Sequence, residues 1–102
     1  MLSRAVGKGR ITYIGALLDS PLMRAAVQKL TESAGLHPAF GPVPNTVEVC
    51  RRSGAGGDVF ILINHSTQPA AVTIPRAMRD VLSGSPAGKS ITLTRYGVAV
   101  LR

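Results

Sequence analysis

Residues 47–64, VEVCRRSGAGGDVFILIN, decide the fold of the second half of the chain. In residues 47–50, valines alternate with Glu and Cys, which is the period of a half-buried β-strand. The glycine-rich segment 53–58 is typical of a turn. The continuous apolar run 60–63 is typical of a strand buried on both faces. This stretch therefore predicts a β-hairpin.

The period of two continues to the end of the chain. Apolar and polar residues alternate in the segments 71–74 and 91–94, and 97–101, GVAVL, is suited to a closing strand. Polar turns separate these segments. Five or six short strands of this kind predict a small antiparallel β-sandwich or open barrel.

The first third of the chain has a different pattern. Residues 10–15, RITYIG, are apolar on both faces and predict an interior strand. Asp19 or Ser20 can cap a helix whose first position is Pro21. An apolar stripe at helical spacing follows over 21–34, made by Leu22, Met23, Ala26, Val27, Leu30 and Ala34. A strand and a helix are half of a βαβ unit, so we expect the remnant of an α/β domain, with α+β content overall.

A boundary falls between these two parts. Residues 36–45, LHPAFGPVPN, contain three prolines and one glycine, which neither continue a helix nor enter a central strand. We therefore expect an α/β remnant over 1–36, a linker over 37–45 and an antiparallel β-domain over 46–102.

Composition limits the kinds of partner that the chain is expected to bind. The chain has 102 residues, with 12 Lys and Arg against 5 Asp and Glu, a formal net charge of +7. The basic residues are mostly scattered and only four aromatic residues are present, so nucleic-acid binding is not favoured. A single cysteine, Cys50, excludes an internal disulfide and a cysteine-built metal site. No segment resembles a signal peptide or a membrane span, so we expect a cytoplasmic protein without membrane contact.

No motif predicts a catalytic, cofactor or metal site. Residues 7–9, GKG, precede a strand rather than open a helix, which is the wrong order for a phosphate loop. His65, Ser66 and Asp58 suggest a nucleophile, base and acid, but neighbouring residues of a strand point to opposite faces. The carboxylates, which are Asp19, Glu32, Glu48, Asp58 and Asp80, are not expected to converge as glycoside hydrolysis requires.

Two sets of motifs resemble a known family when they are taken in order. GKGRITYIG and the helix ending in SAGL resemble the end of the middle, trimer-forming domain of bacterial β-galactosidases of glycoside hydrolase family 42. VEVCRR, VFILINHS, VTIP and RYGVAVLR resemble the C-terminal β-domain of that family. The resemblance extends from about residue 7 to residue 102.

The resemblance implies a parent enzyme with a catalytic barrel upstream, and hence a non-catalytic structural or assembly role for this chain. It implies one partner, the remainder of such an enzyme. The apolar helix face 21–34, which has only one strand to pack on, predicts self-association as the alternative. Two other hypotheses remain open, a carbohydrate-binding β-domain and a small basic nucleic-acid-binding protein. Sugar binding would require Tyr96 to be exposed beside a second aromatic side chain.

Overall fold

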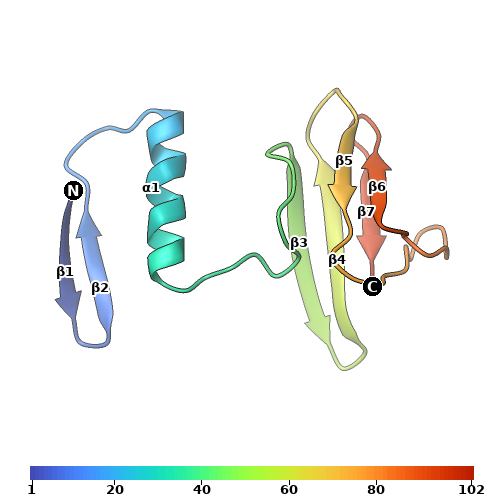
Figure 1. Ribbon diagram of the computed structural model, residues 1–102, viewed down its shortest axis with the longest axis horizontal. Helices are drawn as coiled ribbons and strands as arrows, with labels where there is room; N and C mark the ends of the chain where they lie inside the picture. The colour runs from blue at the N-terminus through green and yellow to red at the C-terminus, as the bar shows by residue number, and fades with distance from the viewer. The chain divides into compact units, whose positions relative to one another are not determined.

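The protein, described by a computed structural model over residues 1–102, consists of two compact units (Figure 1). The first is Met1–His37 and the second is Pro38–Arg102. All twelve buried apolar side chains and the buried Asn64 belong to the second unit. No helix is long and apolar enough to cross a bilayer.

The second unit is built on a three-stranded antiparallel sheet. Strands β3 (Val47–Gly54), β4 (Gly57–Asn64) and β7 (Val98–Leu101) lie in the order β3-β4-β7. The predicted hairpin is confirmed: Val47 pairs with Asn64 at one end and Gly54 with Gly57 at the other. Gly57 has a φ of +101°, a conformation that favours glycine over residues with a Cβ.

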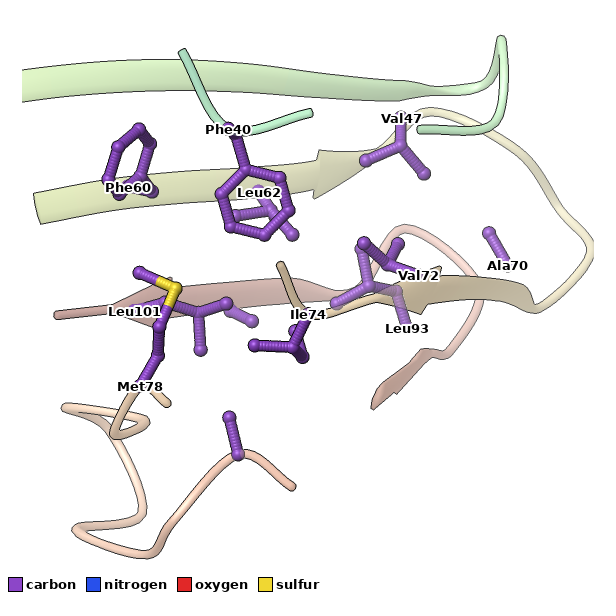
Figure 2. Packing of buried hydrophobic residues seen from close by; sticks show 12 residues of the cluster. Phe40, Val47, Phe60, Leu62, Ala70, Val72, Ile74, Met78, Leu93 and Leu101 are labelled. Carbon is purple, nitrogen blue, oxygen red and sulfur yellow. The ribbon is translucent and has the colours of Figure 1, made fainter. Parts of the chain in front are cut away.

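A second sheet closes the core. Strands β5 (Ala70–Thr73) and β6 (Ser90–Leu93) pair antiparallel, and their inward side chains join those of the first sheet in one apolar cluster (Figure 2). Leu62 and Val72, one from each sheet, are fully buried. The rings of Phe40 and Phe60 add an aromatic contact, with centroids 5.4 Å apart and tilted by 56°. The α+β content and the sandwich-like β-part are confirmed.

Backbone bonds cover the outer side of β7. The N–H of Arg79 donates to the carbonyl of Arg102 at 2.8 Å, and the reverse bond is 3.0 Å. The N–H of Val81 donates to the carbonyl of Val100 at 2.7 Å. The segment that follows β5 therefore protects one edge of the sheet.

Burial on both faces of β4 is not found. Phe60 and Leu62 are buried, whereas Ile61 and Ile63 on the opposite face are only partly covered. The apolar run 60–63 was therefore a poor guide to burial, because nothing within this unit packs over the outer face of the sheet.

The strand predicted over 10–15 is β2 (Gly9–Tyr13), and it is not an interior strand. It pairs antiparallel with β1 (Leu2–Val6) around Gly7, whose φ is +57°. The sequence predicts only one strand before the helix, whereas β2 has a hairpin partner, β1. Ser3 and Arg4 obscured β1 by breaking its apolar pattern, and no residue of the hairpin is buried.

The predicted helix is confirmed as α1 (Ser20–Ser33). Asp19, rather than Ser20, is the N-cap, and its Oδ1 accepts a hydrogen bond from the N–H of Leu22 at 2.9 Å. At the other end, Gly35 has a φ of +68°, and the N–H of Leu36 donates to the carbonyl of Thr31. These are the bonds of a Schellman cap. The helix is well terminated, yet none of its side chains is buried.

Candidate functional site

Three polar side chains meet on the outer face of β3 and β4. Glu48 and Cys50 are two residues apart in β3 and so point to the same face, and the register with β4 brings His65 beside them. The carboxylate of Glu48 accepts from Cys50 Sγ at 3.2 Å and contacts His65 Nε2 at 2.8 Å. Glu48 therefore joins the thiol and the imidazole.

The contacts change the acidity of two groups. The hydrogen bond from His65, followed by that from Cys50, lowers the pKa of the Glu48 carboxyl against a small opposing effect of desolvation. The same contact raises the pKa of the Cys50 thiol, because the thiol donates to an anion. A thiol with a raised pKa is a poor nucleophile, since the thiolate is the reactive form.

The cluster was not predicted from the sequence, although its signal was present. Residues 48 and 50 share a face by the period of two, and the hairpin register then places His65, which directly follows β4, beside Glu48. No group of three His, Cys, Asp or Glu side chains is arranged to hold a metal ion. The cluster is consistent with a polar border of the outer sheet face.

The structure does not form a nucleophile, base and acid from His65, Ser66 and Asp58. Asp58 lies at the opposite end of the hairpin, where its carboxylate accepts from Ser53 Oγ at 2.7 Å and pairs with Arg51 at 2.8 Å. These contacts, that of Ser53 first, lower the pKa of Asp58. Ser66 Oγ accepts from the N–H of Gln68 at 3.0 Å, as in a local turn.

The remaining carboxylates are also engaged locally. Asp19 caps α1, and Glu32 accepts from Gln28 Nε2 at 2.8 Å one helical turn away. Asp80 accepts from the N–H of Leu82 and from Ser83 Oγ, both at 3.0 Å. Each carboxylate has a capping or pairing contact close to it in the sequence, and none of these contacts joins two carboxylates.

The aromatic residues do not form a sugar platform. Tyr96 is 56% exposed and has a φ of +51°, but its stacking partner is the guanidinium of Arg95, 5.2 Å from the ring centroid. The one aromatic pair is Phe40 with Phe60, both in the core. The second aromatic that the carbohydrate-binding hypothesis requires beside Tyr96 is absent.

The geometry of the β-part is matched by a known family. Residues 46–102 match the family described as the β-galactosidase C-terminal domain. This chain belongs to that family. The match covers β3 to β7, that is, both sheets of the second unit. The resemblance to the C-terminal β-domain of family 42 enzymes is confirmed.

Curated relatives extend the match over the first unit. β-Galactosidase YesZ of Bacillus licheniformis is 31% identical over an alignment of 99 residues, and the match covers 93% of this chain and 15% of that protein. β-Galactosidase BglY of Alicyclobacillus acidocaldarius is 31% identical over an alignment of 98 residues, and the match covers 94% of this chain and 14% of that protein. The chain thus spans about 15% of the length of these relatives.

Solved structures match in the same way. A catalytic mutant of Gan42B, a GH42 β-galactosidase from G. stearothermophilus, has a TM-score of 0.87 at 28% identity. The match covers 97% of this chain and 15% of that one. The β-galactosidase from Bacillus circulans sp. alkalophilus has a TM-score of 0.72 at 25% identity, covering 81% of this chain and 12% of that one.

Proposed function

We propose that this chain acts as a non-catalytic assembly segment of a family 42 β-galactosidase. In this proposal residues 1–36 complete an α/β, trimerisation-type domain and residues 46–102 are the C-terminal β-domain. Residues 37–45 link the two, and Phe40 within them packs into the core of the β-part. The family match of 46–102 and the relatives that extend over both units support this division.

One observation carries the proposal: the first unit folds locally but buries no side chain. On α1, Leu22, Met23 and Val27 are each about half exposed, at 57, 49 and 50%. On the hairpin, Ile11 and Tyr13 are exposed to a similar extent. Apolar surface on two neighbouring elements is typical of a segment that docks onto another protein surface.

The docking surface centres on α1. A shallow hollow of about 620 Å³ runs along the helix, and its lining is Leu18, Ser20, Met23, Arg24, Val27, Gln28 and Thr31. Its occupant in this proposal is the remainder of a β-galactosidase, because the relatives carry the same segment within a much longer chain. Self-association through the helix face 21–34 is the competing outcome.

The cytoplasm is the proposed location. Cys50 is free, as expected of a thiol in a reducing compartment, and the β-part is held together by apolar packing without a disulfide.

Complementation tests the proposal. The chain is mixed with a variant of the Bacillus licheniformis β-galactosidase from which the matching segment has been deleted. We expect complex formation on size exclusion, an increased rate of chromogenic galactoside hydrolysis by the truncated enzyme, and no hydrolysis by the chain alone. Met23→Glu or Val27→Glu should weaken the complex at least about tenfold, since each buries a charge in an apolar contact.

Ala25→Glu provides the matched control. It introduces the same charge on α1 at an exposed position that does not line the hollow, and it should bind as the wild type does. Galactoside hydrolysis by the chain alone would contradict the non-catalytic role. Failure of the wild-type chain to bind, with dimers that Val27→Glu dissolves, would show that the helix face serves self-association instead.

A further inference from the structure

Strand β3 forms an edge of the main sheet. In the order β3-β4-β7, the far side of β7 is bonded by residues 79–81, whereas no backbone hydrogen bond reaches the far side of β3 beyond Val47. The N–H of Val47 donates to the carbonyl of Pro44 at 2.9 Å. The unpaired edge is therefore the stretch 48–54.

The ladder shows which residues present their backbone groups at this edge. His65 donates to the carbonyl of Thr46, so Thr46 and His65 form a hydrogen-bonded pair. In an antiparallel ladder every second pair repeats this pattern, so residues 48, 50 and 52 bond to β4. Val49, Arg51 and Ser53 consequently direct their N–H and C=O groups away from β4, and an unpaired row of this kind is a template for another strand.

Strand β3 carries one negative and one positive side chain, each two residues away from Cys50. Glu48 and Arg52 lie on the same face, two residues before and two residues after it. Arg52 is exposed and makes no hydrogen bond or ion pair within the chain. The neighbouring Arg51 differs, because Asp58 neutralises it at 2.8 Å.

We propose that β3 of one copy pairs antiparallel with β3 of a second copy about a two-fold axis at Cys50. Glu48 then lies directly opposite the partner's Arg52, and the two-fold axis repeats the contact. In this register Val49 forms a hydrogen-bonded pair with the partner's Arg51. The pairing uses the backbone groups of residues 49 and 51, which point away from β4. The two three-stranded sheets become one continuous sheet of six strands.

Charge selects this register over its neighbours. Shifting the pairing by two residues in either direction places Cys50 opposite Arg52 or opposite Glu48, and both opposite-charge pairs are lost. Shifting it further places Glu48 opposite the partner's Glu48, or Arg52 opposite the partner's Arg52. Like charges directly opposite each other destabilise a strand pair, so the register centred on Cys50 is preferred.

The contacts already made by Glu48 leave room for the partner's arginine. A carboxylate offers about four acceptor positions, and Glu48 uses one for Cys50 and one for His65. The second copy adds a guanidinium to an anion that is held in place on its own strand. This surface is separate from the helix face of the proposed function, so each can fail alone.

Charge reversal in the full chain tests the pairing. Sedimentation equilibrium should show a dimer for the wild type, weakened at least about two- to thirtyfold in Glu48→Arg and in Arg52→Glu, because each replaces two cross-strand ion pairs by two like-charge contacts. The double variant Glu48→Arg with Arg52→Glu should recover the affinity to within about twofold. Arg95→Glu, which makes the same charge change outside β3, should leave the dimer unchanged.

Cross-linking through Cys50 tests the register. Two cysteines opposite each other in a non-hydrogen-bonded pair have Cα atoms about 4.5 Å apart, which a disulfide can span. Diamide should therefore convert the wild-type dimer to a covalent dimer, taking up the two electrons and two protons of the thiols as it is reduced to the hydrazine. Cross-linking should fall with each single reversal, return in the double variant, and persist in Val27→Glu.

The proposal is overturned if the chain is monomeric at all accessible concentrations. It is also overturned if the single reversals dimerise and cross-link as the wild type does, or if Val27→Glu abolishes both readouts. In the last case the helix face, and not the β3 edge, would join the copies.

Discussion

The two units have equally regular secondary structure and very unequal burial. Helix α1 has an N-cap, a proline in its first turn and a Schellman cap, and the β1–β2 hairpin has five paired positions in register. Residues 38–102 have shorter strands in their second sheet, yet every buried side chain of the protein lies there. Local structure and tertiary burial are therefore separated along this chain.

The difference shows what each kind of signal in the sequence can specify. Caps and turns act within a few residues and produce a helix or a hairpin in either unit. A core requires that apolar faces from distant segments meet, as Leu62 of β4 and Val72 of β5 do (Figure 2). The first unit has the local signals and the apolar faces, but no second layer to meet them.

The largest predicted effect comes from truncating the core of the second unit. Leu62→Ala should lower the free energy of unfolding by about 2–5 kcal/mol, since Leu62 is fully buried and its removal leaves a cavity. Val27→Ala, an apolar truncation on exposed α1, should cost less than about 0.5 kcal/mol. Urea unfolding followed by circular dichroism measures both, and equal losses would remove the distinction between the units.

A buried amide should have the next largest effect. Asn64 is fully buried, donates from Nδ2 to the carbonyls of Gln68 and Thr94, and accepts from the N–H of Ser66. Asn64→Ala should cost about 1–3 kcal/mol, because it leaves these backbone groups without their partner. The exposed amide Gln28 provides the comparison: Gln28→Ala should change the unfolding free energy by only a few tenths of a kcal/mol. An unchanged free energy of unfolding in Asn64→Ala would mean that water replaces the hydrogen bonds of the Asn64 side chain.

The cap of α1 should have a smaller and more local effect. Asp19→Ala should cost about 1 kcal/mol of helix stability by removing the acceptor for the N–H of Leu22. Because α1 has no tertiary support, the loss should appear as reduced helical ellipticity at 222 nm. Asp19→Asn keeps the cap and should keep the signal. A change in the unfolding midpoint of the β-part would show that the units are coupled.

Lowering the pH should have the smallest effect on stability. The contacts with Ser53 and Arg51 lower the pKa of Asp58 below its ordinary value of 3.8. The contribution of Asp58 to stability is therefore present above that value and is lost as the pH falls toward the lower folded pKa. An NMR titration of its carboxyl carbon should show the depressed pKa, and Ser53→Ala should raise it. An unshifted titration would contradict the side-chain contacts.

Much of the fold followed from the sequence because its decisive signals are local. Turn and cap residues specify the hairpin around residues 53–58 and the helix from Pro21. Strand β1 was missed because Ser3 and Arg4 interrupt its pattern, and the second-face burial of Ile61 and Ile63 was wrong because apolar character does not supply a covering layer.

The site was less predictable for a related reason. Glu48, Cys50 and His65 are brought together by the register of β3 and β4, and a one-residue shift would place them on different faces. The register and the free edge of β3 depend on pairing between distant residues, which local turn and strand patterns do not specify. Family motifs, by contrast, were recognised correctly because they depend on residue order alone.

Native-state hydrogen exchange separates the two units experimentally, because it reports stability amide by amide. Amides of β4 and β7 should exchange only through global unfolding, whereas those of α1 and the β1–β2 hairpin should exchange through local opening at much lower free energy. Equal protection in the two units of the isolated chain would contradict this expectation, since the first unit would then be stabilised by a core of its own.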